Sequence, residues 1–407
     1  MRYNILFALL SLCCLGAAAQ QMGDFKFKFY GRVRADVFYN TRANNETVDG
    51  IFYMYPKDHD YDPDGKDLNA TPQGSMYMLY TRLGVDIAGP KVGDAVATAK
   101  IEIDFRGSGT TYSVPRIRHA YVNLDWGKNA VLIGQTWHPL FGEVSPSMLN
   151  LSTGAPFQPF NRSPQLRYRY TSSGGFMGTL ATIWQMQYTS QGPDGKSHNY
   201  LKNSCIPEIY ASVDYKKGRW IAGVGAELLS LKPRQSATVD GVTYKVNERV
   251  TSVSVEAHVK YKTPDWFISG KSVLANNLTQ CSMLGGYGVI ETNSHNGEMK
   301  YTPFRHSMTW LNFVYGKKWQ PGFFIGYLKN LGTGKAITGP TYGTGLDVDQ
   351  LLSTNWQISY NLPNWKLGFE FEPSTAWYGT LNLKDGHVRD THSVTNYRFL
   401  AVAMYIF

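Results

Sequence analysis

Long apolar runs are missing from this 407-residue chain after its first 19 residues, and none approaches the roughly 20 residues that a membrane helix needs. The chain is therefore either soluble or crosses a membrane as strands. Charged residues are scarce, at 17%, whereas aromatic residues are frequent, with 27 Tyr, 20 Phe and 10 Trp. Aromatic side chains favour strands, and Tyr and Trp also favour membrane interfaces, so the composition favours the second class.

Cysteine is scarce as well, and histidine and cysteine form no cluster with the spacing of a metal site. After residue 19 the cysteines are Cys205 and Cys281, which leaves open one disulfide or two inert thiols.

The net charge of +9 would suit nucleic acid, but lysine and arginine are scattered along the chain. This scatter, with the export described next, argues against a nucleic-acid partner and favours anionic solutes or lipid headgroups.

The first 19 residues have the three parts of a secretory signal peptide. A positively charged start is followed by an apolar run over residues 5–15 and by small residues that end at Ala19. We expect cleavage of this segment, residues 1–19, after Ala19. A lipoprotein signal ending at Cys13 is the alternative, but Leu12 stands where a small residue would be needed. The sequence thus predicts export to the cell envelope.

Apolar and polar residues alternate from Phe25 onward, with Phe25 and Phe27 on one face and Lys26 and Lys28 on the other. A period of two describes a strand with one apolar and one wet side. At about fifteen residues this strand exceeds the five or six usual in soluble sheets, but it suits a tilted strand across a bilayer. The same pattern predicts sixteen strands: 25–39, 76–87, 95–106, 116–126, 130–137, 165–171, 175–188, 207–216, 219–231, 250–261, 265–275, 305–316, 320–329, 350–361, 365–373 and 396–407.

Short and long connections alternate between these strands. Links such as 89–93 and 172–174 are short turns with Gly, Pro, Ser or Lys, whereas links such as 40–75 and 276–304 are long. Short turns on one side and long loops on the other are typical of outer-membrane barrels, with the turns periplasmic and the loops outside. A soluble sandwich or propeller would not separate the loop lengths so cleanly. The sequence therefore predicts an all-β fold, a transmembrane antiparallel β-barrel of about 16 strands over residues 20–407.

The last predicted strand ends on an aromatic residue. Tyr397, Phe399, Tyr405 and Phe407 fall on its apolar face. A terminal Phe on an amphipathic strand resembles the signal by which outer-membrane barrels are recognised for assembly. The sequence thus predicts the barrel-assembly machinery as a partner, through Phe407.

Several spaced motifs between residues 76 and 170 resemble one known family. They are Arg82-Leu83-Gly84-Val85-Asp86, Lys100-Ile101-Glu102-Ile103-Asp104-Phe105, Arg116-Ile117-Arg118-His119-Ala120-Tyr121 and Gly134-Gln135-Thr136-Trp137, then Arg162, Pro164-Gln165 and Arg167-Tyr168. In these motifs the chain resembles the DcaP-like porin family. The resemblance implies a sixteen-stranded trimeric barrel that passes small, often negatively charged, organic solutes. Unlike that family, the chain has no obvious coiled-coil heptads before Phe25.

A pore selects solutes by its diameter and by the charge of its lining, so the wet faces of the strands matter most. Strand parity places a set of charged residues in the lumen. These predicted lining residues are Arg32, Arg34, Arg82, Lys100, Glu102, Asp104, Arg167 and Arg169. Five arginines opposite the acids of strand 95–106 predict a field that favours anions. The alternative is that these charges only pair with their neighbours and are solvated.

Strand 116–126 has conflicting parity. His119 and Tyr121 hold the wet positions, which would turn Arg116 and Arg118 toward lipid at a cost of about 2–4 kcal/mol each at mid-depth. We expect that both arginines lie at the rim of the barrel or that a bulge near Ile117 resets the parity.

The segment 138–164 follows the fifth strand, where general porins carry a constriction loop folded into the barrel. Its five prolines and three phenylalanines suit a compact segment packed against a wall. Its charged residues, Glu143 and Arg162, are the candidates for the constriction. The alternative is an exterior loop buried in contacts between subunits.

The first outer loop contains Asp60-Tyr61-Asp62-Pro63-Asp64-Gly65. Three carboxylates at alternate positions before a turn Gly form the front half of a calcium loop, so Asp60, Asp62 and Asp64 are candidate calcium ligands. Thr71 stands at the twelfth position instead of the bidentate Glu, so a solvated acidic loop is the alternative. We expect no required cofactor.

Together these patterns predict a passive outer-membrane porin for small hydrophilic, anionic solutes, assembled as a homotrimer in outer-membrane lipid and without catalytic residues. A surface receptor or adhesion barrel acting through its long loops is one alternative. A barrel enzyme such as a lipase is another, but the adjacent Ser294-His295-Asn296 cannot form a catalytic geometry on a strand face. A barrel for hydrophobic substrates would need an apolar internal path in place of the charged one.

Overall fold

The computed structural model describes residues 20–22, 25–47, 52–107 and 113–407. The signal peptide expected over residues 1–19 lies outside the described residues. No helix in the described ranges is long and apolar enough to cross a membrane.

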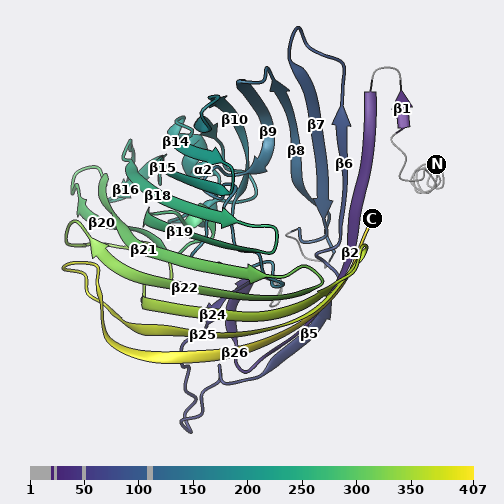
Figure 1. Ribbon diagram of the computed structural model, residues 1–407. Helices are drawn as coiled ribbons and strands as arrows, with labels where there is room; N and C mark the ends of the chain where they lie inside the picture. The colour runs from purple at the N-terminus through teal and green to yellow at the C-terminus, as the bar shows by residue number, and fades with distance from the viewer. Residues whose placement is uncertain (1–19, 23–24, 48–51, 108–112) are drawn as a thin grey trace, which may run out of the picture.

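Sixteen strands form a closed antiparallel barrel (Figure 1). The sheet closes where the first and last barrel strands pair, for example at Val33 and Tyr405, and Figure 1 accordingly shows the C-terminus beside β2. The predicted fold is confirmed. The barrel strands are β2 (Phe25–Asn40), β6 (Arg82–Ala88), β7 (Val96–Asp104), β8 (Arg116–Asp125), β9 (Asn129–Trp137), β10 (Arg162–Thr171), β11 (Phe176–Ile183), β14 (Glu208–Lys217), β15 (Trp220–Leu231), β18 (Val250–Lys262), β19 (Trp266–Asn276), β21 (Met299–Tyr315), β22 (Trp319–Thr333), β24 (Val348–Asn361), β25 (Trp365–Leu381) and β26 (Val388–Ile406).

The predicted strand 76–87 is interrupted in the structure. β5 (Gln73–Tyr77) pairs with the outer half of β2, and β6 pairs with its first half. A turn closed by the Thr81 N–H and the Met78 carbonyl, 3.0 Å apart, separates the two pieces. The Thr81 hydroxyl accepts a hydrogen bond from the backbone N–H of Arg34, at 3.2 Å, so β2 keeps a partner across the gap.

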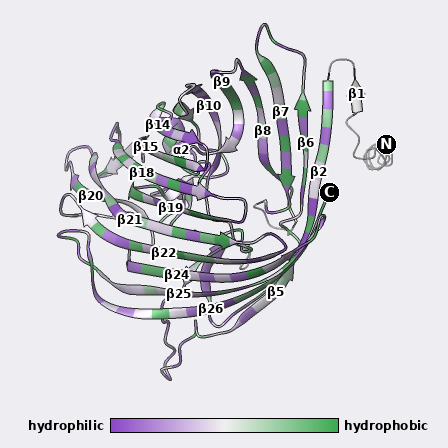
Figure 2. Cartoon of the chain, viewed as in Figure 1, coloured by the Kyte–Doolittle hydropathy of each residue, from purple (hydrophilic) through white to green (hydrophobic). Residues whose placement is uncertain are grey.

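Apolar and polar residues alternate along the barrel strands, as the green and purple bands in Figure 2 show. The apolar set faces outward, where Val33, Val37 and Leu83 are 45–48% exposed. Charged residues such as Arg34 and Asp104 are instead buried inside the barrel. An apolar exterior around a polar interior is the inverse of a soluble protein and fits a barrel surrounded by lipid.

Tryptophans mark the end of the barrel that carries the short turns. The aromatic rings of Trp220 and Tyr261 lie 4.7 Å apart, centre to centre, and those of Trp365 and Tyr405 lie 5.1 Å apart. Aromatic residues in this position form the girdle of a transmembrane barrel at the membrane interface. The tryptophans next to short turns are Trp126, Trp220, Trp266, Trp319 and Trp365.

The long connections gather at the opposite end and carry small elements of their own. The separation of short turns from long loops is as the sequence predicts. Besides β1 (Gln20–Met22), which pairs with β2, the additional elements are β3 (Asn44–Thr47), β4 (Phe52–Pro56), β12 (Ser190–Gly192), β13 (Gly195–Ser197), α2 (Asn199–Ser204), β16 (Ser236–Val239), β17 (Val242–Lys245), η2 (Thr279–Cys281), β20 (Gly285–Thr292) and β23 (Thr341–Thr344).

Candidate pore constriction

Residues 138–161 link β9 to β10 and fold into the barrel; we refer to them as the inward segment. Leu140, Val144 and Phe157 are 0% exposed and pack in a hydrophobic cluster with Phe324 and Leu328 of β22. Apolar side chains on this segment therefore meet apolar side chains on the inner face of a distant strand. Burial of this contact holds the segment inside the lumen.

The inward segment crosses to the wall opposite its own strands. Arg34 of β2 donates a hydrogen bond to the Leu149 carbonyl at 2.6 Å. Such bonds satisfy backbone groups that a buried loop would otherwise leave unpaired. Backbone N–H groups of the segment donate to side chains on three strands: Ser147 to Asn312 of β21 (2.9 Å), Leu149 to Gln357 of β24 (2.6 Å) and Asn150 to Glu370 of β25 (2.8 Å).

Two glycines in the far wall permit this close approach. A Cβ atom on Gly326 of β22 would lie 2.4 Å from the ring of Phe157. A Cβ atom on Gly368 of β25 would lie 2.5 Å from the side chain of Leu149. Any larger residue at either position would displace the inward segment from the wall.

A cavity of about 250 Å³ lies between the inward segment and the strands that precede it; we call it the arginine cavity. On the side of the segment it is lined by Phe141, Pro146 and Met148. Glu102 is the acidic residue in its lining. The basic residues of the lining are His119 and four arginines: Arg82, Arg106, Arg118 and Arg162.

A β-bulge in β8 brings arginines into this lumen. On the neighbouring β7, Glu102 pairs with His119 but the next residue, Ile103, pairs with Ile117. Arg118 is thus an extra residue in β8, and the inward and outward positions exchange there. The hypothesis of a bulge near Ile117 is confirmed, and no arginine of β8 faces lipid.

Carboxylates of β7 neutralise the two arginines of β8. Arg118 donates to Glu102 at 2.5 Å and to Asp104 at 3.1 Å. Arg116 holds both oxygens of Asp104, at 2.9 and 2.6 Å, in the bidentate geometry that suits guanidinium and carboxylate. These ion pairs fix the wall and leave little free charge on Arg116 and Arg118.

Arg106 and Arg162 have aromatic neighbours in place of carboxylates. The guanidinium carbon of Arg106 lies 4.4 Å from the centre of the Tyr80 ring, and that of Arg162 lies 4.6 Å from the Trp137 ring. Arg162 also donates to the Tyr188 hydroxyl at 2.7 Å. Both arginines are buried, and the Nε of each has no hydrogen-bond partner. Within the described ranges neither forms an ion pair, so both leave positive charge in the cavity.

The predicted lining residues divide into several groups. Arg82, Glu102 and Arg162 meet in the arginine cavity, and Arg118 links Glu102 to Asp104. Arg32 is close by and has two unpartnered nitrogens, Nε and Nη2. The structure thus brings together predicted residues from four strands, β2, β6, β7 and β10, with Arg162 at the start of β10 and not in the loop predicted over 138–164.

Other predicted residues lie elsewhere. Arg34 is 2% exposed and is paired with Asp36, so its charge holds the inward segment. Lys100 is paired with Asp86 at 2.7 Å. A second cavity, of about 210 Å³, contains the remaining three: Glu143, which is paired with Lys216, and Arg167 and Arg169.

Two important residues were missed by the sequence reasoning. Arg106 continues the alternation of Lys100, Glu102 and Asp104 by two more residues, so strand parity carried further would have found it. Trp137 belongs to the motif Gly134-Gln135-Thr136-Trp137, but nothing in that motif predicts that its ring stacks on that of Phe141, 3.9 Å away. Its position depends on where the inward segment returns, which local pattern does not encode.

The first outer loop is organised by Asp67, which follows the candidate ligand Asp64 by three residues and the turn residue Gly65 by two. Burial opposes ionisation of Asp67, but hydrogen bonds from His59 and from backbone N–H groups, with the charge of Arg42, hold its pKa well below its usual range. Asp62 accepts bonds from the N–H groups of Asp64 and Lys66, at 2.9 and 2.8 Å. Within the described ranges, ligand atoms of Asp60, Asp62 and Asp64 do not converge as a metal-binding group.

Cys205 and Cys281 are both free in the structure. Cys205 is exposed after α2, and Cys281 is buried in η2. Of the two alternatives that the sequence left open, the structure has two separate thiols.

A closed sixteen-stranded barrel with an apolar exterior and a loop folded into its lumen defines the class of protein: the chain is a bacterial outer-membrane β-barrel with the porin fold. More particularly, the model of the DcaP outer membrane protein family matches residues 17–177. The resemblance found in the motifs between residues 76 and 170 is confirmed. No curated protein was found to match this sequence.

Solved structures agree on the fold. The outer membrane channel DcaP of Acinetobacter baumannii is 20% identical with a TM-score of 0.67, over 97% of this chain and 100% of that chain. OmpT of Vibrio cholerae is 13% identical with a TM-score of 0.57, over 96% and 100% of the two chains. OmpF of Salmonella typhi is 11% identical with a TM-score of 0.54, over 94% and 98%.

Proposed function

We propose that this protein is a passive porin for small hydrophilic solutes with a preference for anions. The observation that carries the proposal is the lining of the arginine cavity beside the inward segment, where two of the four arginines, Arg106 and Arg162, have no carboxylate partner among the described residues. A solute that passes between the segment and this wall experiences a positive field in a region of low dielectric constant. Such a field raises the local concentration of anions and lowers that of cations.

The unpaired arginines support the preference most directly. Arg106 and Arg162 are buried without a carboxylate partner, and Arg32 has two free nitrogens. Burying an uncompensated charge is costly, so these groups gain when an anion enters. The planar guanidinium can hold a carboxylate through two parallel hydrogen bonds. Small organic carboxylates are therefore the solutes that this lining suits.

We also propose a homotrimer that works by diffusion and catalyses no reaction. OmpT of Vibrio cholerae, which is similar in fold, has been solved in a trimer form. A receptor would act through its outer loops, and an enzyme would need a catalytic group. The charged path here lies inside the barrel. A receptor barrel would give no conductance, and a lipase would consume added lipid or ester.

The test is the single-channel conductance of the purified protein in a planar bilayer, with the reversal potential measured across a potassium chloride gradient. We expect a conducting channel that prefers chloride, and a preference that declines as salt rises, because the Debye length falls to about 3 Å at 1 M. A channel that passes potassium more readily than chloride would contradict the anion preference. If the folded protein gave no conductance, the proposal that it is a porin would be contradicted.

A further inference from the structure

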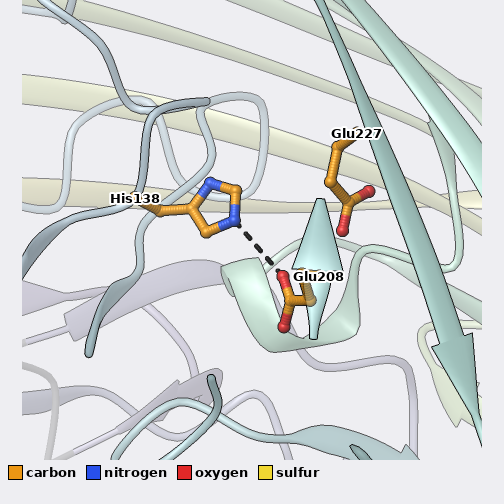
Figure 3. Close-up of side chains that lie close together, drawn as sticks. All are labelled: His138, Glu208 and Glu227. Carbon is orange, nitrogen blue, oxygen red and sulfur yellow. Dashed lines mark hydrogen bonds and ion pairs between the residues drawn. The ribbon is translucent and has the colours of Figure 1, made fainter. Parts of the chain in front are cut away.

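A buried cluster of side chains that could bind a metal ion lies at the start of the inward segment (Figure 3). His138, the first residue after β9, meets Glu208 of β14 and Glu227 of β15, and one ligand atom from each lies within 4.8 Å of the others. All three side chains are 0% exposed, and none lines the arginine cavity. Among the described residues, no other group of three His, Cys, Asp or Glu side chains converges in this way.

Strand register explains why the two carboxylates meet. β14 and β15 are neighbours, and Tyr210 pairs directly with Glu227. Directly paired residues share a face of the sheet, and Glu208 shares that face because it lies two residues from Tyr210. Both carboxylates therefore point into the barrel, where His138 approaches from the inward segment.

Hydrogen bonds satisfy Glu208 but leave oxygens unpartnered around it. Glu208 accepts from Gln185 at 2.8 Å, from Gln280 at 3.3 Å and from His138 at 3.2 Å. Glu227 accepts from Gln280 at 3.3 Å through one oxygen, and its second oxygen has no partner. Gln280 is 1% exposed, and its own side-chain oxygen is unpartnered as well.

The cluster lacks a compensating charge. Within the described ranges, neither Glu208 nor Glu227 lies within ion-pairing distance of a lysine or arginine. The ionisable partner of Glu208 is His138. Two carboxylates buried together repel each other unless a proton or a cation lies between them. A cation would also satisfy the free oxygen of Glu227.

We propose that this cluster binds one divalent transition-metal cation, such as Zn²⁺ or Mn²⁺, through Glu208, Glu227 and Nε2 of His138, while the Gln280 amide nitrogen donates to both carboxylates. Carboxylate and imidazole ligands suit these ions. Nδ1 of His138 accepts from the Leu140 N–H at 3.1 Å, so Nε2 carries the ring proton toward Glu208. A metal bound at Nε2 would replace the hydrogen bond from His138 to Glu208. The ring proton would then lie on Nδ1, and the Leu140 N–H would give up its bond to that nitrogen.

The bound cation would fasten the inward segment directly at one end and through Gln280 at the other. Gln280 lies in η2, and η2 also holds the returning end of the segment. The Phe160 N–H donates to the Cys281 carbonyl at 2.7 Å, and the Asn161 side chain donates to the Gln280 carbonyl at 3.1 Å. The ion would thus join His138, at one end of the segment, to β14 and β15, and the hydrogen bonds of Gln280 would connect the other end to the same carboxylates.

The test is a measurement of metal binding. Untagged protein is folded in detergent and stripped of metal with a chelator. It is then titrated with Zn²⁺ and, in a separate experiment, with Mn²⁺. We expect one ion per chain by elemental analysis. Glu227→Gln keeps the size of the side chain and should lose this ion or bind it at least about tenfold more weakly. Gln280→Ala should weaken binding in the same direction and serves if Glu227→Gln does not fold, as judged by heat-modifiable migration.

Glu256→Gln is the matched control. Glu256 is a buried carboxylate that contacts His258 at 3.0 Å, but it belongs to no converging group of metal ligands, so this variant should keep the ion. Wild-type protein that binds neither metal would overturn the proposal and leave a carboxyl pair that shares a proton. Equal binding by the wild type and the Glu227 and Gln280 variants would overturn it too. Because the readout is binding, its failure is distinct from a failure of conductance.

Discussion

Two arginines of the lumen show that the same residue type has different roles when its partners differ. Arg34 is held by Asp36 and donates to the Leu149 carbonyl, so its charge is used to position the inward segment. Arg162 lies against the rings of Trp137 and Tyr188 and has no carboxylate partner in the described ranges. Only the second kind of arginine leaves a field for a passing solute.

The residue-scale prediction compares these two arginines. Arg162→Gln should move the reversal potential toward cation preference with little loss of stability, because it removes an uncompensated buried charge. Arg34→Gln should instead lower the thermal stability, since it leaves Asp36 buried and unpaired, a change that costs about 3–5 kcal/mol. Reversal potentials and melting temperatures of both variants check this. Equal shifts in reversal potential for the two would contradict the distinction.

Strand parity alone could predict which charges face the lumen but not which of them are neutralised. Strand parity predicted that Arg82, Glu102 and Asp104 face the lumen, because alternation shows directly which side of a strand a residue occupies. The pairing of Arg118 with Glu102 depends on a bulge, and that of Arg34 with the Leu149 carbonyl depends on a segment distant in sequence. Such contacts follow from tertiary packing, which a period of two does not contain.

At the scale of elements, the inward segment is positioned by small residues in the wall it meets. Gly326→Val would place a Cβ in contact with the Phe157 ring, 2.4 Å away, so the segment must move from β22. We expect a larger single-channel conductance and a weaker anion preference, because solutes would pass farther from the arginines. Measurement in planar bilayers checks both.

Gly178→Val is the control for this prediction. Gly178 lies in β11, and no atom lies within 4 Å of the position that its Cβ would take. The same added volume and β-branched side chain should therefore leave conductance unchanged. Unaltered conductance in folded Gly326→Val protein would mean that the inward segment does not limit the channel.

At the scale of the whole molecule, the sequence predicted the barrel well because lipid outside and water inside impose alternation on every strand. All sixteen strands were found, whereas their outer ends were predicted less well: β21 begins at Met299 instead of 305, and β26 begins at Val388 instead of 396. Beyond the membrane both faces contact protein or water, so the alternation weakens there. Alternation therefore marks the part of each strand that crosses the bilayer, and it does not mark where the strand begins or ends.

Phe407 adds two hydrogen bonds to the seam between β2 and β26 that closes the barrel. The Gly31 N–H donates to the Phe407 carbonyl at 2.9 Å, and the Phe407 N–H donates to the Gly31 carbonyl at 3.1 Å. The Phe407 ring also covers Gly31, where an added Cβ would lie 2.7 Å from the ring. Phe407 therefore joins the two ends of the sheet, in addition to the role in assembly that its sequence position suggests.

Refolding without cellular components separates these two roles of Phe407. Deletion of Phe407 removes two hydrogen bonds that together contribute about 1–3 kcal/mol, and it uncovers Gly31. We expect a lower yield of heat-modifiable barrel when denatured protein refolds in detergent, where no assembly machinery is present. Phe407→Leu keeps the backbone bonds and should refold better than the deletion. If the deletion refolds as well as wild type in detergent yet fails in cells, Phe407 acts through recognition alone and its contacts with Gly31 do not hold the barrel closed.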